Sequence, residues 1–126
     1  LDALLEAEAR TQNNQGLQLC FAMNYGGRDE IVKAVSVLAS KVKAGELDPQ
    51  DLDEEAISRY LYTSDIPDPD LLIRTSGEIR LSNFMLWQLA YTELWFTDVL
   101  WPDFTREHFY QAIVEYQGRA RRYGAV

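Results

Sequence analysis

The sequence predicts an α/β fold, in which helices flank a largely parallel sheet. Three short apolar runs, at residues 17–24, 71–75 and 94–101, have the nearly continuous hydrophobicity that is typical of strands buried on both faces. Segments with apolar residues at helical intervals alternate with these runs, as in βαβ units. Because only about three strands are visible and a parallel sheet needs cover on both faces, we expect about half of a larger sheet.

The first part of the chain predicts a helix, a strand and a second helix. The leucines of residues 1–12 recur near helical spacing, and this helix starts on leucine rather than methionine, as though it continued from something longer. The turn-prone residues NNQG end it. The run LQLCFAMN at 17–24 predicts a strand, and the apolar spacing from Ile31 to Val42 predicts a helix that ends at KAGE.

The acidic segment ELDPQDLDEE, at residues 46–55, predicts the start of a short helix. Acidic residues at a helix start suit the helix dipole and cap its free N–H groups. We therefore expect a solvated, capped helix that begins at Asp51 or Asp53.

The last part of the chain predicts two strands and two helices. The strand at 71–75 leads through a loop to Ser82, which is expected to cap a helix over residues 83–93. The third apolar run then forms a strand. Thr105 opens a final amphipathic helix that ends near Gly118.

Charge and composition limit the partners of this chain. With 20 acidic and 12 basic residues, its formal net charge of -8 repels nucleic acid and anionic membrane surfaces. No apolar run approaches the length of a membrane span, so we expect a cytoplasmic protein. Cys20, the single cysteine, is expected to be buried and inert, and with the single histidine, His108, it offers no soft metal site. Any metal would be a hard cation such as Mg²⁺.

The stretch LLIRTSGEIRLSNF, residues 71–84, holds the best candidate for an anion site. Arg74 ends the predicted strand, and ligands of open parallel sheets bind beyond the carboxyl ends of the strands. Arg80 and Ser82 lie at the mouth of the predicted next helix, whose free N–H groups favour an anion. Two guanidinium groups, a hydroxyl and a helix start together predict a phosphate or diphosphate cradle.

An ordinary charged surface is the alternative for these residues. Arg74 would then form surface ion pairs with Glu78 or Asp70, and residue types alone favour the anion site only slightly. Ser76 and Gly77 favour it further, because small residues let the backbone approach a ligand closely.

Two further features bear on this site. The turn Asn24–Arg28, NYGGR, also follows a predicted strand and faces the same sheet edge if the strands are neighbours, although alone it reads as a surface turn. On a helix, Glu93 would lie about 16 Å from Ser82 at about 1.5 Å per residue. Glu93 is then either a lone exposed carboxylate or a group that acts across a dimer interface.

Three stretches of the sequence resemble one protein family. MNYGGRDEIVKAV, then DPDLLIRTSGEIRLSNFMLWQLAYTELWFTDVLWPDF, and the final RRYG are similar to the cis-prenyltransferases, and among them to the bacterial undecaprenyl diphosphate synthases. The resemblance runs from Leu17 onward, and its long middle motif is highly specific. It implies that residues 1–126 are the C-terminal portion of a single cis-prenyltransferase domain.

The resemblance implies a homodimeric, Mg²⁺-dependent transferase. Such enzymes add isopentenyl diphosphate repeatedly to an allylic diphosphate such as farnesyl diphosphate. The long cis-polyprenyl diphosphate that results serves in bacteria as the lipid carrier of cell-wall sugars, so the membrane is met only through the product. The implied site residues are the isopentenyl diphosphate ligands Arg74, Arg80, Leu81 and Ser82, the C-terminal pair Arg122 and Gly124, and the Mg²⁺ ligand Glu93.

Two departures from the family pattern limit what this chain does alone. Ile79 stands where some members carry a histidine near the metal. The resemblance also leaves out the family's N-terminal half, which holds the Asp-containing motif for Mg²⁺ and the allylic diphosphate. We therefore place no catalytic residue in this chain and expect the isolated fragment to be inactive.

Two other functions stay open at this point. A non-catalytic partner subunit of a heteromeric cis-prenyltransferase would share the fold, although such a subunit has no physical need for a phosphate cradle. A generic acidic interaction module would use the acids of residues 46–55 as its surface.

Overall fold

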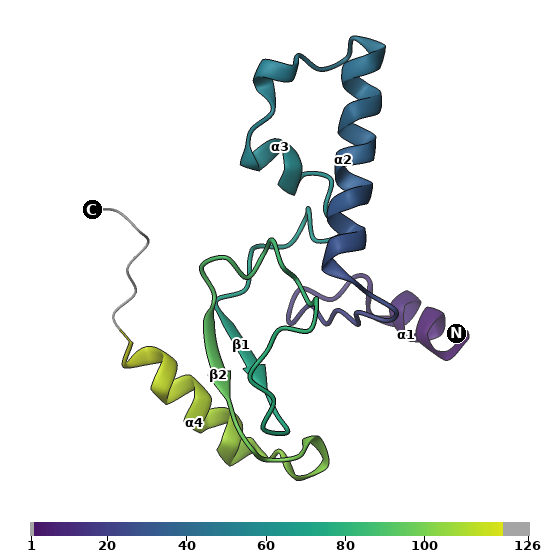
Figure 1. Ribbon diagram of the computed structural model, residues 1–126. Helices are drawn as coiled ribbons and strands as arrows, with labels where there is room; N and C mark the ends of the chain where they lie inside the picture. Colours follow the sequence, from purple (N-terminus) through teal and green to yellow (C-terminus); the bar gives the residue numbers. More distant parts are fainter. Residues whose placement is uncertain (1, 120–126) are drawn as a thin grey trace.

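The computed structural model describes residues 2–119 of the chain. Helices flank a small parallel sheet, as the sequence predicts, with α2 and α3 at one end, α4 beside β2, and α1 set apart from the rest (Figure 1). The elements, in order, are α1 (Asp2–Thr11), α2 (Gly27–Ala44), the 3-10 turn η1 (Pro49–Asp51), α3 (Glu54–Ser58), β1 (Leu71–Arg74), β2 (Glu93–Phe96), the 3-10 turn η2 (Trp101–Asp103) and α4 (Arg106–Gln117).

The sheet in the described part of the chain has two strands. β1 and β2 pair in parallel, with Leu71 opposite Glu93 at one end and Arg74 opposite Phe96 at the other. Both strands were expected from their apolar runs, and β2 is shorter than the predicted run 94–101 because the chain turns away after Phe96. The carboxyl ends of both strands therefore meet at one edge, where Arg74 lies.

Helix α2 is the longest element, and its ends follow from local chemistry. Gly45 adopts the left-handed conformation, with φ of 74°, and its N–H and that of Glu46 bond back to the carbonyls of Val42 and Lys41. This Schellman arrangement satisfies the last carbonyls and ends the helix. Ala34 and Leu38 of α2 are buried, and α2 contacts α3.

The short acidic segment behaves as a capped, solvated turn and helix. Asp48 accepts the N–H of Gln50 at 2.9 Å, and Asp53 accepts the N–H of Ala56 at 2.7 Å. These bonds satisfy N–H groups that the helix itself leaves without partners. The expected start of α3 at Asp53 is therefore confirmed.

Helix α4 lies on β2 and begins as the sequence predicts. Thr105 and His108 form a reciprocal capping box, in which the N–H of Thr105 donates to His108 Nδ1 at 3.0 Å. Ala112 faces the sheet with no exposed surface, and Trp95 of β2 is also buried. Gly118 caps the other end.

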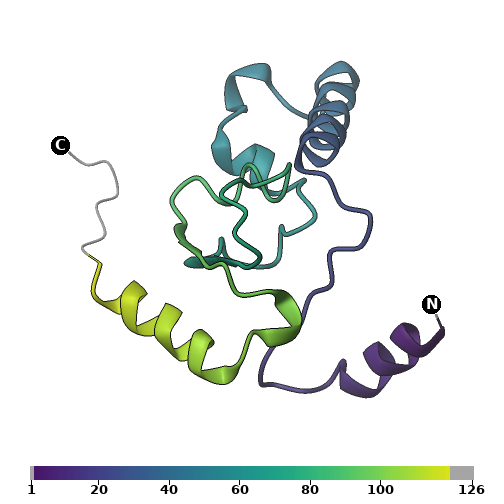
Figure 2. The ribbon, with the colours of Figure 1, turned by 60° about the horizontal axis from the view of Figure 1, so that its bottom comes forward.

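The prediction of a strand at residues 17–24 is wrong for this structure. The segment is extended and pairs with no strand in the described chain (Figure 2), and its side chains are exposed. Cys20 is therefore exposed rather than buried. The apolar run has strand character, but the residues described here supply no neighbour to cover it.

The prediction of a helix over residues 83–93 is also wrong. Ser82, Asn83 and Met85 have positive φ values of 50°, 64° and 45°, whereas a right-handed helix needs φ near -60°. The segment forms successive turns instead. Its side chains reach other elements: the Trp87 Nε1–H donates to Ser58 Oγ at 3.0 Å, and the Gln88 amide donates to Thr63 Oγ1 at 2.9 Å. These long-range bonds replace the helical ladder.

Within residues 2–119, no helix combines the length and the apolar character that crossing a membrane would require.

Candidate functional site

Arg74 lies at the centre of the candidate site. It is the last residue of β1 and is half-buried, and its Nη1 donates to the carbonyl oxygen of Arg80. Nη1 and Nη2 also lie 3.3 and 3.4 Å from Ser82 Oγ. The structure thus brings the Arg74 guanidinium to the hydroxyl of Ser82 and to the backbone of Arg80.

Arg80 is exposed, and its guanidinium forms an ion pair with Glu78. The surface pairing that the sequence offered for Arg74 is therefore made by Arg80 instead. An exposed ion pair of this kind is worth about 0–1 kcal/mol. A ligand with two or more negative charges can therefore displace Glu78 from Arg80.

The helix start that was expected beside Ser82 is supplied by a different helix. The N–H of Gly27, the first residue of α2, donates to the carbonyl oxygen of Asn83 at 2.7 Å, and the N–H of Arg28 donates to Asn83 Oδ1 at 2.9 Å. Asn83 thus holds the first turn of α2 against the Ser82 loop. The turn 24–28 and this loop therefore contact each other, although the strand that was expected to lead into the turn is not formed.

Glycines make this close approach possible. A Cβ added at Gly26 would lie 2.9 Å from Asn83 Nδ2, and one at Gly27 would lie 3.1 Å from Leu86 and 3.2 Å from Asn83 O. Gly77 has a similar role in the other turn, since its φ is 70° and a Cβ there would lie 2.9 Å from Asp98 Oδ1. These glycines let two backbone segments meet, which is a different reason from the ligand approach expected of Gly77.

A buried cluster of polar side chains joins α2 to the segments that carry Tyr62 and Gln88. Glu30 of α2 has no exposed surface and accepts the Tyr25 hydroxyl, the N–H of Tyr62 at 2.7 Å and the Gln88 amide at 3.3 Å. Burial raises the pKa of the Tyr25 phenol, and its hydrogen bond to Glu30 raises that pKa further. Sequence reasoning missed this cluster, because Glu30 looks like any acidic residue near a helix start.

Glu93 lies at the other end of the sheet. It is the first residue of β2, three pairing positions away from Phe96, which faces Arg74, so roughly 10 Å separates the two positions along the strand. Its carboxylate accepts Arg119 Nη1 at 2.7 Å, and the same nitrogen donates to Leu94 O at 3.0 Å. Glu93 and Arg74 are therefore apart within one chain, and the helical spacing of about 16 Å expected between Glu93 and Ser82 does not apply, because no helix joins them.

Of the remaining residues predicted to bind substrate, the structure describes only Leu81. Leu81 is half-buried in the loop between Arg80 and Ser82. Arg122 and Gly124 lie outside the described residues. Within residues 2–119, no group of three or more His, Cys, Asp or Glu side chains is arranged to hold a metal ion.

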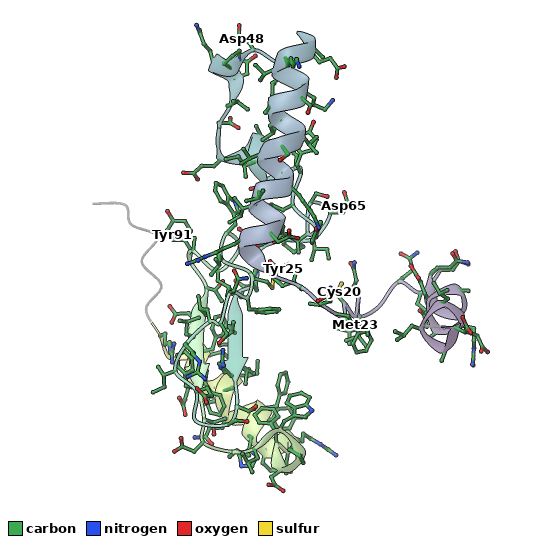
Figure 3. The ribbon with its side chains drawn as sticks, turned by 45° about the vertical axis from the view of Figure 1, so that its right-hand side comes forward. Cys20, Met23, Tyr25, Asp48, Asp65 and Tyr91 are labelled. Carbon is green, nitrogen blue, oxygen red and sulfur yellow. The ribbon has the colours of Figure 1, made fainter. Side chains whose placement is uncertain are left out.

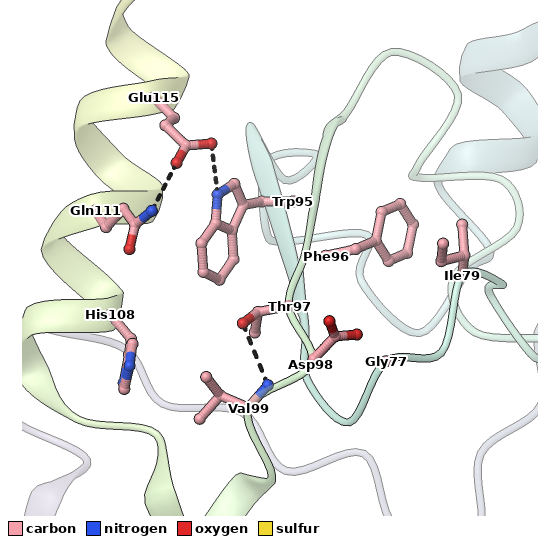
Figure 4. A pocket seen from close by; sticks show the side chains of 10 residues that line it. All are labelled: Gly77, Ile79, Trp95, Phe96, Thr97, Asp98, Val99, His108, Gln111 and Glu115. Carbon is pink, nitrogen blue, oxygen red and sulfur yellow. Dashed lines mark hydrogen bonds between the residues drawn. The ribbon is translucent and has the colours of Figure 1, made fainter.

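A pocket of about 490 Å³ lies between β2, α4 and the Gly77 turn (Figure 4). Glu115 lines it and accepts the Trp95 indole N–H at 2.8 Å and the Gln111 amide at 3.0 Å. Asp98 also lines it, whereas Arg74, Arg80 and Ser82 do not. Its carboxylates oppose an anion, so we assign the anion site to the Arg74 loop and not to this pocket.

The chain resembles known proteins along almost its whole length. A family model described as "Putative undecaprenyl diphosphate synthase" matches residues 1–124. An isoprenyl transferase of Geobacillus kaustophilus (strain HTA426) is 64% identical over 124 residues, which are 98% of this chain and 48% of that protein. An isoprenyl transferase of Bacillus subtilis (strain 168) is 59% identical over 126 residues, again 48% of its length.

Two solved structures share the fold. Lavandulyl diphosphate synthase from Lavandula x intermedia, in complex with dimethylallyl diphosphate, matches with a TM-score of 0.93 and 45% identity, over 98% of this chain and 53% of that one. A probable undecaprenyl diphosphate synthase from Campylobacter jejuni matches with a TM-score of 0.80 and 34% identity, over 98% of this chain and 55% of that one. The chain thus spans about half the length of these relatives. It belongs to the undecaprenyl diphosphate synthase family of prenyltransferases.

Proposed function

We propose that this chain supplies the isopentenyl diphosphate-binding part of a cis-prenyltransferase. The reaction joins isopentenyl diphosphate to an allylic diphosphate such as farnesyl diphosphate and makes a long cis-polyprenyl diphosphate. We propose undecaprenyl diphosphate, the cell-wall carrier lipid, as the product. The observation that supports the diphosphate site is the contact of Arg74, at the carboxyl end of β1, with both Ser82 and the backbone of Arg80.

The residues of this loop have the chemistry that a diphosphate needs. Arg74 is already oriented by its bonds to the loop, so little side-chain entropy remains to be lost on binding. Arg80 adds a second guanidinium once it leaves Glu78, and Ser82 adds a hydroxyl. Leu81 lies in the loop between Arg80 and Ser82 and is a further proposed ligand. The family resemblance adds Arg122 and Gly124 to the proposed ligands. The bound diphosphate would hold the nucleophilic alkene in position for attack.

The proposed cofactor is Mg²⁺, with Glu93 as one ligand. When bound, Mg²⁺ would stabilise negative charge on diphosphate oxygens. The described residues do not by themselves form such a site, since no cluster of ligands exists among them and Arg119 pairs with Glu93. The other ligands would be phosphate oxygens or residues outside those described here.

The rest of the proposal follows from the family resemblance alone. It includes a homodimer, with Glu93 acting across the dimer, a cytoplasmic location, and contact with the membrane only through the lipid product. The 126-residue chain alone would be inactive, since the resemblance places the site that ionises the allylic diphosphate in the family's N-terminal half. Chain elongation of farnesyl diphosphate by the isolated chain would overturn this part.

Binding of inorganic diphosphate to the isolated chain tests the proposed site directly. Each of Arg74→Ala and Arg80→Ala should weaken binding about tenfold or more in isothermal titration calorimetry, since a charge-assisted hydrogen bond is worth about 1.5–3 kcal/mol. Arg59→Ala is the matched control, because Arg59 is an exposed arginine that pairs with Glu55 on α3. Equal weakening by all three changes would indicate only non-specific attraction.

In a complete enzyme, Arg80→Ala should affect the binding of the two substrates differently. Arg80→Ala should raise the Michaelis constant for isopentenyl diphosphate and leave that for the allylic diphosphate nearly unchanged. An unchanged Michaelis constant and turnover for isopentenyl diphosphate would remove Arg80 from the site.

A further inference from the structure

Arg74 and Arg80, the two arginines of the proposed diphosphate site, have partners of different kinds. Among the described residues, the partners of the Arg74 guanidinium are neutral: it donates to the carbonyl oxygen of Arg80 and lies 3.3 Å from the hydroxyl of Ser82. The Arg80 guanidinium instead pairs with the carboxylate of Glu78. A diphosphate therefore reaches Arg74 without displacing a charged group, whereas at Arg80 it must replace an anion.

The turn that leads to Glu78 is fixed to the sheet. The N–H of Ser76 donates to the carbonyl oxygen of Val99 at 2.8 Å. The N–H of Gly77 donates to the carbonyl oxygen of Thr97 at 2.9 Å. These bonds hold the chain that follows β1 against the chain that follows β2. Glu78 comes directly after this turn, so its backbone starts from a fixed point.

The two side chains of the ion pair differ in exposure. The side chain of Arg80 is 63% exposed, and that of Glu78 is 40% exposed. The arginine therefore has more freedom to turn from one anion to another, while Glu78 stays beside the turn. An ion pair as exposed as this one is weak, so it opens and forms again readily.

The proposed reaction requires a diphosphate that leaves this loop after each addition, and the present inference rests on that function. In each addition the allylic C–O bond breaks and inorganic diphosphate leaves, a C–C bond forms to the isopentenyl alkene, and a proton passes to the solvent. The lengthened chain then carries only the diphosphate that came from isopentenyl diphosphate. That diphosphate must leave the Arg74 loop before a new isopentenyl diphosphate can bind there, and slow release would limit turnover.

We propose that Glu78 promotes the release of the diphosphate by pairing again with Arg80. In the empty site Glu78 holds Arg80, and an incoming diphosphate displaces it. When the diphosphate moves away, Glu78 takes its place, so the guanidinium is not left without an anion. Glu78 thus lowers the affinity of the site and speeds dissociation, and Arg74 keeps its neutral partners throughout.

Calorimetry with inorganic diphosphate tests this proposal on the 126-residue chain. Glu78→Gln keeps the size of the side chain but removes its charge, so it should tighten binding roughly 3- to 10-fold. Glu55→Gln is the matched control, because Glu55 forms an exposed ion pair with Arg59 on α3. Helix α3 contacts α2 and lies away from the carboxyl end of β1 (Figure 3, where Asp48 marks the segment before α3). The control should change the affinity less than about twofold, because salt screens distant charges.

A double-mutant cycle shows whether Glu78 acts through Arg80. In a chain that already carries Arg80→Ala, Glu78→Gln should change the affinity less than about twofold, because the guanidinium that it would free is absent. An equal gain with and without Arg80 would mean that Glu78 only repels the ligand by its charge. That result would overturn the proposal.

In a complete enzyme that contains this chain, Glu78→Gln should affect binding and release in opposite ways. The Michaelis constant for isopentenyl diphosphate in the first addition should fall, because the site binds more tightly. Every later addition should be slower, so products of a single addition should accumulate. Chromatography of the products at successive times measures this effect, which a purely structural role of Glu78 would not produce.

The outcomes separate this proposal from the proposed function. Diphosphate binding that needs Arg74 and Arg80 but is unchanged by Glu78→Gln would overturn the role of Glu78 and leave the site in place. A complete enzyme with an unchanged distribution of products would also overturn that role. If none of the proteins bound diphosphate, both the site and the role of Glu78 would be wrong.

Discussion

Asn83 joins two turns that are far apart in sequence: its side-chain Oδ1 accepts the backbone N–H of Arg28 at 2.9 Å, across 55 residues. Its carbonyl oxygen accepts the N–H of Gly27 at 2.7 Å. One residue therefore satisfies two free N–H groups at the start of α2 and fixes the loop that carries Ser82. We regard Asn83 as a positioning residue for the proposed diphosphate site.

Two substitutions of Asn83 should separate what its side-chain hydrogen bond contributes to stability from what its backbone conformation contributes. Asn83→Ala should lower the free energy of unfolding by about 1–2 kcal/mol, because it removes the cap and places alanine at a φ of 64°. Asn83→Asp keeps the acceptor and should be milder. Urea denaturation followed by circular dichroism measures both. An Asp variant as unstable as the Ala variant would contradict the capping role.

Glycine 27 should not tolerate a side chain. Gly27→Ala would place a Cβ 3.1 Å from both the backbone nitrogen and Cγ of Leu86, so the loop must shift, at a cost of about 1–3 kcal/mol. Gly16→Ala is the control, since nothing lies within 4 Å of the Cβ that it would add. Thermal unfolding of both variants checks this. If the two variants melted alike, the close approach of α2 to the loop would not be a constraint.

The phenol of Tyr25 should lose its proton at a higher pH than an ordinary tyrosine. Burial and then Glu30 raise its pKa above the ordinary value of 10.0, so the folded state holds this proton more tightly than the unfolded state. The stability that this proton gives is complete below pH 10 and is lost as pH rises above it. Absorbance near 295 nm, followed against pH, should show a tyrosine step well above pH 10.

Two variants identify that late tyrosine. Tyr25→Phe should remove this late step, and Glu30→Gln should move the step to lower pH because the neighbouring negative charge is gone. A titration curve that is the same in all three proteins would mean that Tyr25 and Glu30 do not interact in solution.

Ala112 is the buried residue of α4, the helix that contacts β2. This residue has no exposed surface, so Ala112→Leu should overpack the contact and cost about 1–3 kcal/mol. Val114→Leu is the control on the same helix, because Val114 is 66% exposed and should change stability by less than about 0.5 kcal/mol. Urea unfolding, monitored by tryptophan fluorescence, compares the two. Similar losses at both positions would place the core elsewhere.

The elements that the sequence predicted correctly have their causes close by in the chain. The apolar spacing of α2, the glycine at its end and the Thr105 cap of α4 are all local signals, and the structure confirms each of them. The same holds for β1, β2 and the caps of the acidic segment. The contacts of Arg74 with Arg80 and Ser82 could also be predicted, because only a short loop separates these residues from the end of the strand.

The elements that were wrongly predicted depend on distant partners. The segment 83–93 has a helical pattern of apolar residues, but Asn83 bonds to α2 and Gln88 bonds to Glu30. These contacts, not local propensity, decide its backbone. The run at residues 17–24 has the composition of a buried strand. Its burial requires neighbouring segments that are not among the described residues. No local pattern reports either condition.

The bare segment between α1 and α2 also determines how the isolated chain is digested. Proteases bind their substrates as extended strands, and residues 17–23 already have that shape, exposed and without backbone bonds to the rest of the described chain. Chymotrypsin, which cuts after large apolar residues, should cleave first after Leu17, Leu19 or Phe21. That cut releases α1 and leaves α2, the sheet and α4 on one piece. A brief digestion thus distinguishes a bare segment from one that a partner protects.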